Sequence, residues 1–328
     1  MERRLERANV SRVKSAAPAD DRARAAVLMK PVALLVAMRP HQWVKNVFVL
    51  AALLFGWGES GLAPGYLDGR LGNTLLAVLA FCLGSSAIYL LNDVMDVESD
   101  RQHPGKSRRP IAAGEVPIPV ALGASALCVV TALLLGWKAS SSEGSVAMLV
   151  GGYMLLNFFY SLKLKHIVLV DAFCIAGGFL LRVLGGSFAA QATASHWLML
   201  CTFFLALFLA LCKRQAEISL LGEGRGSHRK ILLEYTPAFL DQGVVVLATC
   251  AIVSYTMYTV SEDTAAKFGN RLLWTVPFVV FGLFRYLLLV QTEKGGGNPT
   301  RVLLGGDLPF LVNNVAYVVT VAALFYFH

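Results

Sequence analysis

One asparagine and three aspartates occur within nine residues of the sequence: Asn92, Asp93, Asp96 and Asp100. They end an apolar run, 75–91, that is long enough to form a membrane helix. Because positions four apart stack on one face of a helix, three of them should form a line with Asp93 beside it. Carboxylates this close repel one another unless a cation lies between them. The pattern therefore predicts a Mg²⁺ site, since Mg²⁺ binds a few carboxylates together with substrate phosphates. The alternative is a solvated acidic helix end.

A basic cluster follows the acidic one directly. After a turn at Pro104 and Gly105 come Lys106, Arg108 and Arg109. Arginine offers a two-pronged donor to phosphate, and lysine offers a point charge. Acids that hold a metal, beside bases that hold phosphate oxygens, predict a clamp for a diphosphate. An ordinary basic loop at a membrane surface is the alternative, and the neighbouring acids weigh against it.

Three further polar clusters adjoin apolar runs and are candidates for phosphate binding. They are Arg39, Gln42, Lys45 and Asn46; Tyr160 and Lys163; and Lys213, Arg214 and Glu217. Each also has a purely structural interpretation. The first cluster could anchor the chain at the lipid headgroups beside Trp43, and the second could be an ordinary basic anchor at the membrane surface. In the third, Lys213 and Glu217 could form a surface ion pair. Asp171, Arg182 and Arg285 lie inside apolar runs, where charges are costly unless paired or near water, so Arg182 is expected to face the bundle interior. His103 has no metal-ligand spacing and is predicted to be structural.

Membrane helices must position these clusters. The chain has 328 residues, 56% of them hydrophobic, and no polar stretch is long enough to form a separate soluble domain. Nine apolar runs approach the ~20 residues that cross a bilayer: 32–56, 71–95, 117–137, 146–161, 167–188, 197–212, 239–260, 272–290 and 310–327. Because backbone polar groups in lipid must be satisfied within a segment, all nine are predicted to be helices. The predicted fold class is an all-α, polytopic membrane protein.

The basic residues predict the orientation in the membrane. Twenty-one Lys and Arg residues lie in the N-terminal tail and in the loops after the second, fourth, sixth and eighth runs, against four on the other side. The N-terminus and the acidic line should then face the cytoplasm, with the C-terminus outside. The Arg-rich stretch 1–30 lacks the features of a signal peptide and is predicted to be a disordered cytoplasmic tail before a transmembrane domain at 31–328.

The six cysteines have no C-x-x-C spacing, which argues against a disulfide framework or a zinc site. No feature predicts a nucleic-acid partner. The polar loops 261–271 and 291–309 receive no assignment. Small residues are compatible with close helix packing within the bundle or in a homo-oligomer, and they are Gly177, Gly178, Gly185 and Gly186.

The NDxxDxxxD pattern at 92–100, followed by Arg109-Pro110 and Gly114 in a chain with nine apolar runs, resembles the UbiA superfamily of intramembrane prenyltransferases. The resemblance extends from about Pro31 to the C-terminus. It implies a nine-helix bundle with a central cavity that faces the cytoplasm, bound Mg²⁺, and a substrate that carries a diphosphate.

One departure from the superfamily pattern narrows the resemblance. Most members carry a second motif, DxxxD, after the sixth span, where this chain has Lys213-Arg214-x-x-Glu217 and so only one acid. With RPxQWxKN at 39–46 and HPxKxxRPIAxG at 103–114, the chain is similar to the decaprenyl-phosphate phosphoribosyltransferase branch. That resemblance implies 5-phosphoribosyl 1-diphosphate as donor and a polyprenyl phosphate as acceptor. It also implies a bacterial cytoplasmic membrane and a product used for cell-wall arabinan.

The resulting hypothesis is a Mg²⁺-dependent transfer in which the lipid phosphate displaces diphosphate from the ribose C1 with inversion. No general base is expected, because a phosphate oxygen is already anionic at pH 7. The lipid phosphate is assigned to the cluster at 39–46. The candidates for the remaining phosphates are Lys163, Arg182, Lys213 and Arg214.

Two alternatives are a prenyltransferase that acts on an aromatic or quinone acceptor, and a transporter whose intramembrane charges line a pathway. The transporter is disfavoured because the sequence has no evident internal repeat and its charges gather at one face of the membrane.

Overall fold

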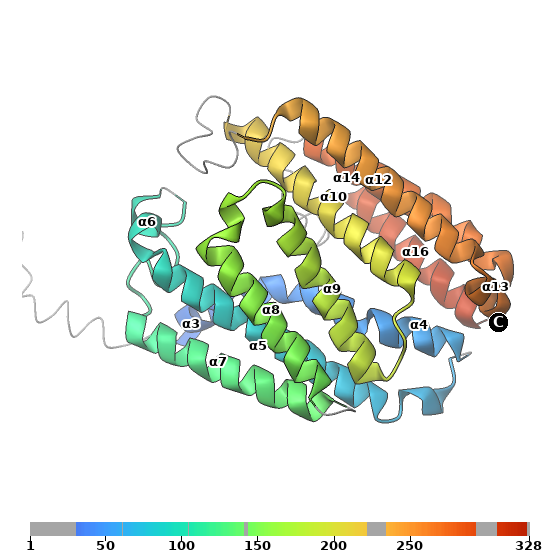
Figure 1. Ribbon diagram of the computed structural model, residues 1–328, viewed down its shortest axis with the longest axis horizontal. Coiled ribbons are helices and arrows are strands. Elements are labelled where there is room, and N and C mark those ends of the chain that lie inside the picture. Colours follow the sequence, from blue (N-terminus) through green and yellow to red (C-terminus); the bar gives the residue numbers. More distant parts are fainter. Residues whose placement is uncertain are drawn as a thin grey trace, which may run out of the picture. The chain divides into compact units, whose positions relative to one another are not determined.

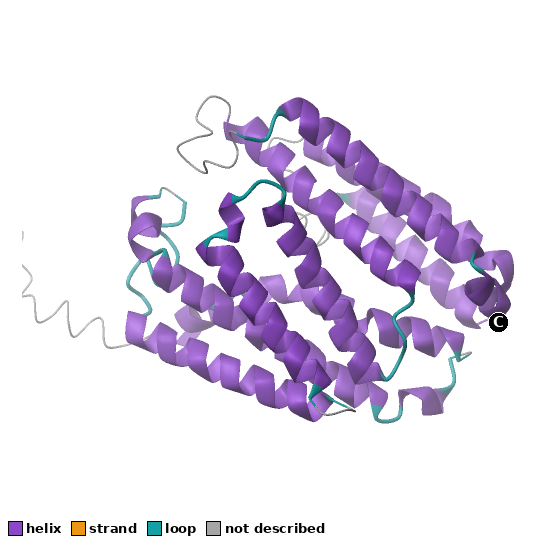
Figure 2. Ribbon diagram, in the orientation of Figure 1, coloured by secondary structure: helices purple, strands orange, loops and turns teal. Residues whose placement is uncertain are grey.

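The computed structural model describes residues 31–60, 62–103, 105–140, 144–221, 234–292 and 307–326. Within these residues every regular element is a helix, as the purple ribbons of Figure 2 show. The all-α prediction is therefore confirmed. The predicted tail at 1–30 and most of the predicted loop at 291–309 lie outside the described residues.

The described chain divides into two compact units. The smaller unit takes in the described residues up to Pro40 together with Tyr89–Leu127, and the larger takes in His41–Ile88 and the described residues from Cys128 onward. The long helix α5 (Arg70–Met95) contributes residues to both.

The smaller unit consists of α3 (Pro31–Ala37), the end of α5, α6 (Val97–Gln102) and the first part of α7 (Ile118–Ala139). Its core is apolar and is made of Ala33, Ala37, Leu90, Val97, Ile111, Val116 and Ala121. Between α6 and α7 the chain turns at Gly114, whose φ of +78° is strained for any residue with a Cβ. This loop carries the basic residues of the predicted clamp.

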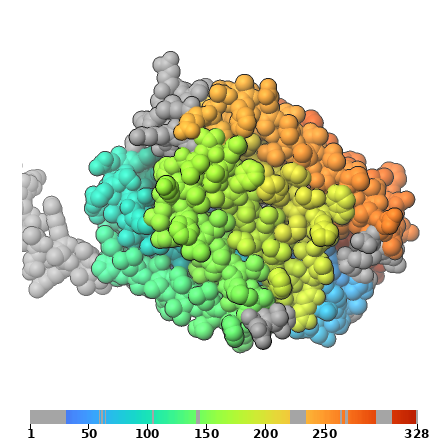
Figure 3. Space-filling model, in the orientation of Figure 1, coloured from blue at the N-terminus to red at the C-terminus, as the bar shows by residue number. Residues whose placement is uncertain are grey.

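The larger unit holds the remaining helices. Besides most of η1 (Pro40–Leu50) and parts of α5 and α7, they are α4 (Ala51–Glu59), η2 (Pro64–Leu67), α8 (Ser145–Leu162), η3 (Leu164–His166), α9 (Val170–Ala190), α10 (His196–Leu221), α12 (Pro237–Val260), α13 (Glu262–Phe268), η6 (Gly269–Thr275), α14 (Val276–Thr292) and α16 (Leu308–Tyr326). Helix α9 packs against α8 and α10, α10 also packs against α12, and α14 packs against α16 (Figure 1). In Figure 3 the side chains of α8, α9 and α10, coloured green to yellow, form a continuous surface.

Eight helices of the described chain are long and apolar enough to cross a membrane, and they correspond to the second to ninth predicted runs. The protein is therefore an integral, multi-pass membrane protein. The first run, 32–56, forms the three shorter helices α3, η1 and α4, so the predicted count of nine membrane helices is not confirmed. The break has a local cause, because Pro40 disfavours a helical conformation at the preceding residue. Arg39 has a φ of +55°, which lies outside the right-handed helical region.

One glycine of α9 permits a close backbone contact. A Cβ at Gly186 would lie 1.8 Å from the carbonyl oxygen of Val49 in η1. We therefore expect Gly186→Ala to cost about 1–3 kcal/mol or more of stability, because backbone must move to relieve the clash. The melting temperature of the purified variant in detergent measures this. The matched control is Gly152→Ala in α8, where a Cβ would meet no heavy atom within 4 Å; an unchanged or higher melting temperature is expected for it. Equal melting temperatures for the two variants would contradict the tight contact.

Candidate active site

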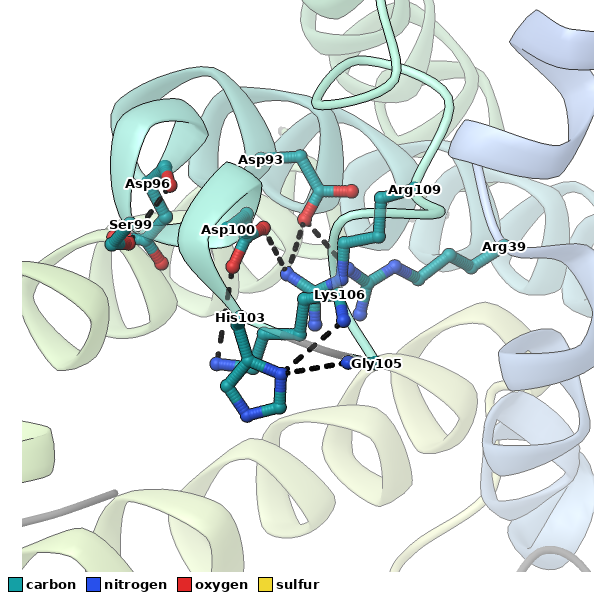
Figure 4. A network of polar contacts seen from close by, with 9 residues as sticks. All are labelled: Arg39, Asp93, Asp96, Ser99, Asp100, His103, Gly105, Lys106 and Arg109. Atoms are coloured by element: carbon teal, nitrogen blue, oxygen red, sulfur yellow. Dashed lines mark hydrogen bonds and ion pairs between the residues drawn. The ribbon is translucent and has the colours of Figure 1, made fainter. Parts of the chain in front are cut away.

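Two aspartates and three basic residues of the smaller unit form one cluster, shown in Figure 4. Asp93 in α5 and Asp100 in α6 both accept hydrogen bonds from Nη1 of Arg109, at 3.1 Å and 2.6 Å. Arg39 Nη2 donates to the same Oδ1 of Asp93 at 2.6 Å. Lys106 Nζ lies 3.9 Å from Oδ1 of Asp100. Two helices, the loop after α6 and the segment after α3 thus meet at residues that the sequence identified.

The cluster has buried acids and accessible bases. The side chains of Asp93 and Asp100 are 3% and 2% exposed, whereas those of Arg39, Arg109 and Lys106 are 23%, 29% and 48% exposed. Three cations and two carboxylates give the cluster a net positive charge. Because the basic side chains are the exposed ones, this positive charge is accessible at the surface. Such an arrangement suits a polyanionic ligand, because guanidinium and ammonium groups are strong donors to phosphate oxygens.

Arg39 adopts a backbone conformation that is uncommon for a residue with a side chain, with a φ of +55°. Its guanidinium group lies 4.7 Å from the ring centroid of Tyr89, in addition to its ion pair with Asp93. Both partners belong to the same unit as Arg39. These two contacts offset the backbone strain and fix the arginine over the carboxylate.

The predicted line of metal ligands is brought together only in part. Helix α5 ends at Met95, and Figure 4 shows Asp96 apart from the Asp93–Arg109–Asp100 contacts, beside Ser99. Among the described residues, no group of three or more His, Cys, Asp or Glu side chains is arranged to hold a metal ion. The metal assignment therefore stays a prediction.

The donor chemistry at this place nevertheless fits Mg²⁺. Oδ1 of Asn92 is buried and has no hydrogen-bond partner within the described residues. An amide oxygen without a donor, next to carboxylates, is the type of oxygen ligand that Mg²⁺ uses. The charges of Asp93 and Asp100 are at present offset by Arg39, Lys106 and Arg109.

The loop that carries the basic residues is shaped by His103. Its Nδ1 accepts hydrogen bonds from the backbone N–H groups of Gly105 and Lys106, at 3.1 Å and 3.3 Å. This contact is a turn-stabilising one, as expected for the structural role predicted for the histidine. Arg108 is exposed.

A second charged network lies in the larger unit, around Arg214 of α10. Its Nε donates to Oδ2 of Asp171 at 2.8 Å, and its Nη1 donates to Glu217. The side chains of Arg214 and Asp171 are 1% and 0% exposed. Lys213 differs: its side chain is 49% exposed, with Nζ 4.0 Å from Oε1 of Glu217. Of the predicted Lys-Arg pair, only Lys213 is accessible to a ligand in this structure.

Tyr235 completes this network and was not identified from the sequence. Its hydroxyl donates to Oδ1 of Asp171 at 2.8 Å and accepts from the backbone N–H of Leu169 at 2.8 Å. Burial raises the pKa of the Tyr235 phenol, so it stays protonated and able to donate. Leu169 has a φ of +65°, and the hydrogen bond holds this strained residue at the start of α9. An aromatic residue directly before the helix-capping Thr236 is the one local signal that the sequence offers.

We expect Tyr235→Phe to destabilise the protein by about 1–3 kcal/mol, because a buried carboxylate oxygen and a backbone N–H both lose their partner. Thermal unfolding in detergent measures the loss. Tyr326→Phe is the control, since this tyrosine is 74% exposed at the end of α16. If both variants melt alike, the Tyr235 hydroxyl has no such role.

A third cluster surrounds Arg182 of α9, which is buried as predicted. Its Nε donates to Oδ1 of Asn46 at 2.7 Å, its Nη1 to the carbonyl oxygen of Gly178 at 2.9 Å, and its Nη2 to the hydroxyl of Tyr153 at 2.9 Å. Nδ2 of Asn46 donates to Sγ of Cys82 at 3.0 Å. Two of the predicted phosphate-binding residues, Asn46 and Arg182, therefore touch each other.

The other candidates lie nearer the surface. Gln42, Lys45 and Tyr160 are half-buried, and Lys163 is exposed in the turn after α8. Trp43, interpreted as a headgroup anchor, donates from Nε1 to Oγ of Ser86 at 3.0 Å.

Arg285, for which the sequence suggested no partner, pairs with Asp307 at 2.7 Å. Hydrogen bonds from Arg285 hold the pKa of this aspartate below its usual range. Asp307 also accepts from the backbone N–H of Phe310 at the start of α16, so the pair is a structural one.

Comparison with known proteins gives consistent matches. Residues 46–302 match the model of the UbiA prenyltransferase family. The chain is 37% identical over 275 residues to the decaprenyl-phosphate phosphoribosyltransferase of Corynebacterium glutamicum, covering 83% of this chain and 80% of that protein. It is 34% identical to the enzyme of the same name from Mycolicibacterium smegmatis, covering 90% and 92%. Among solved structures, a UbiA homolog from Archaeoglobus fulgidus bound to GPP and Mg²⁺ has a TM-score of 0.66 at 17% identity, covering 89% and 99%.

Proposed function

The chain belongs to the UbiA prenyltransferase family, and on that premise we propose that it transfers the 5-phosphoribosyl group of 5-phosphoribosyl 1-diphosphate to a polyprenyl phosphate. The relatives named decaprenyl-phosphate phosphoribosyltransferase support this choice, because they are similar over most of both chains. We further propose that the product serves cell-wall arabinan synthesis. The protein would act in the bacterial cytoplasmic membrane, with its N-terminus and active site at the cytoplasmic face and its C-terminus outside, as the basic residues predict.

The observation that carries the proposal is the cluster of Figure 4. Arg39, Arg109 and Lys106 are anchored by buried carboxylates and remain partly exposed. Their N–H groups are therefore positioned before a ligand arrives, and less conformational entropy is lost on binding. A diphosphate with several anionic oxygens is the ligand that such a cluster suits best.

In the proposed reaction, the bond between the ribose C1 and the diphosphate oxygen breaks, and a bond forms between C1 and an oxygen of the lipid phosphate. The electron pair of the broken bond leaves with the diphosphate. No proton has to be removed from the acceptor, because the attacking oxygen of the lipid phosphate is already anionic at neutral pH. Arg39, Lys106 and Arg109 would bind the negative charge that develops on the leaving group, and a preorganised cation is most effective in that role. Attack from the opposite face would invert the configuration at C1.

We propose Mg²⁺ as the cofactor, held by Asn92, Asp93, Asp96 and Asp100. Bound there, it would supply further positive charge to the departing diphosphate. The family member from A. fulgidus that was solved with GPP and Mg²⁺ supports a divalent ion in this fold.

One assay tests the proposal. Purified protein in detergent, with Mg²⁺, labelled 5-phosphoribosyl 1-diphosphate and decaprenyl phosphate, should give a labelled lipid whose mass equals decaprenyl phosphate plus a phosphoribosyl group. Omission of either substrate should abolish it. Failure to form this lipid, with transfer of a prenyl group from a polyprenyl diphosphate to an aromatic or quinone acceptor, would instead support the alternative function within the same family.

A further inference from the structure

Among the described residues, uncharged groups alone hold the guanidinium group of Arg182. Asn46, the carbonyl oxygen of Gly178 and the hydroxyl of Tyr153 accept its hydrogen bonds. The ring of Tyr153 lies 4.3 Å from its central carbon and that of Phe179 lies 5.4 Å away. Within the part of the chain that the structure describes, no carboxylate pairs with this arginine.

A second buried arginine, Arg214, does have carboxylate partners, so the lack of one at Arg182 among the described residues is not general to buried arginines of this unit. Both arginines belong to the larger unit and both are almost fully buried, at 6% and 1% exposed. Arg214 has two carboxylate partners, Asp171 and Glu217. A buried cation inside a membrane helix is costly without a counter-charge, and a charged residue in such a place is a candidate functional site that a bound anion would complete.

The N–H groups of Arg182 that remain after these contacts suit a phosphate. A guanidinium group has five N–H bonds. The three hydrogen bonds within the protein use the Nε–H and one N–H each on Nη1 and Nη2. One N–H on each terminal nitrogen remains, and two parallel N–H bonds are the fork that binds two oxygens of one phosphate.

We propose that Arg182, oriented by Asn46 and Tyr153, is the receptor for a phosphate monoester. This inference deepens the proposed function and rests on it, since two phosphate monoesters take part in that reaction: the head of the lipid acceptor and the 5-phosphate of the donor. Of the two, the lipid phosphate is favoured by the depth at which the Arg182 guanidinium lies in the membrane span. The hydrogen bond to Gly178 places the guanidinium two turns, or about 12 Å, along α9 from Val170, which is within the apolar part of the span.

Two substitutions neutralise Arg182 by opposite routes. Asn46→Asp supplies a carboxylate where Nε already donates at 2.7 Å; it gives up only the donation to Cys82, since thiol sulfur is a weak acceptor. Arg182→Gln removes the cation. Both variants should stay folded, because each abolishes an uncompensated buried charge. Arg285→Gln is the matched control, an intramembrane arginine whose partner is Asp307.

The readout is ligand binding without turnover, measured as the rise in melting temperature that each probe causes. The probes are decaprenyl phosphate and ribose 5-phosphate. We expect one of them to stabilise both the wild type and the Arg285→Gln variant. The same probe should bind the Asn46→Asp and Arg182→Gln variants about 10- to 100-fold more weakly, because one or two charge-assisted hydrogen bonds contribute that much to affinity. Loss for decaprenyl phosphate identifies the acceptor site, and loss for ribose 5-phosphate identifies the donor site.

Two results overturn the inference: neither probe stabilises the wild type, or both neutralised variants bind as tightly as the wild type. The proposed function can fail separately. If no phosphoribosyl transfer is found but decaprenyl phosphate protection depends on Arg182, the phosphate site stands and only the reaction assigned to it is wrong.

Discussion

Replacing Asp93 by asparagine is expected to lower the rate of phosphoribosyl transfer at least about 100-fold, the equivalent of ~3 kcal/mol of transition-state stabilisation. The carboxylate is buried and is shared by Arg39 and Arg109. Asparagine keeps one oxygen at this position but removes the negative charge that anchors both guanidinium groups. It would also weaken one of the ligands proposed for Mg²⁺, because a neutral amide oxygen attracts the ion less strongly than a carboxylate does.

Steady-state kinetics over a range of Mg²⁺ concentrations separate these two roles. If Asp93 binds the metal, the variant should need more Mg²⁺ to reach its remaining activity. If it only anchors the arginines, the Mg²⁺ dependence should stay as in the wild type and the KM for the donor should rise. Glu98→Gln in α6 is the control, since Glu98 is 78% exposed and pairs with Arg101 alone among the described residues. Near-normal turnover by both Asp93→Asn and Asp96→Ala would refute the metal assignment.

The site in the smaller unit was largely predictable because four of its five charged residues are close in sequence. Asp93, Asp100, Lys106 and Arg109 span seventeen positions, so helix periodicity and one turn suffice to bring them together. The position of Asp96 was not predictable in the same way. The line of ligands assumed one continuous helix, whereas α5 ends at Met95 and α6 begins at Val97. Hydrophobic patterns locate the spans well but do not show where a helix ends near a charged segment.

The pairings within the charged networks of the larger unit could not be predicted from one sequence. Asp171 and Tyr235 are 64 positions apart, and Asn46 and Arg182 are 136 apart. The cost of a charge in a membrane predicts that Asp171 and Arg182 need partners, but only the packing of helices decides which ones. Conversely, Lys213 and Arg214 look equivalent as neighbours in the sequence. Because successive side chains on a helix point about 100° apart, one faces the protein interior and the other the surface.

This difference leads to opposite expectations for the two residues. Arg214→Met is expected to lower stability by about 3–5 kcal/mol, because it leaves Asp171 buried with its charge unpaired. Lys213→Met should leave the melting temperature nearly unchanged, since an exposed ion pair contributes at most ~1 kcal/mol. If Lys213 meets a substrate phosphate, the same variant should lose about tenfold in kcat/KM through a higher KM.

A double variant tells a positioning residue from one that binds substrate. Arg214→Met combined with Asp171→Asn removes both buried charges and keeps an oxygen that can accept from the Tyr235 hydroxyl. Stability should then recover most of what Arg214→Met lost, because a neutral pair carries no unpaired buried charge. If Arg214 only positions α9 and α10, kcat/KM should recover with the fold. Recovered melting temperature without recovered activity would instead support the prediction that Arg214 itself binds a phosphate.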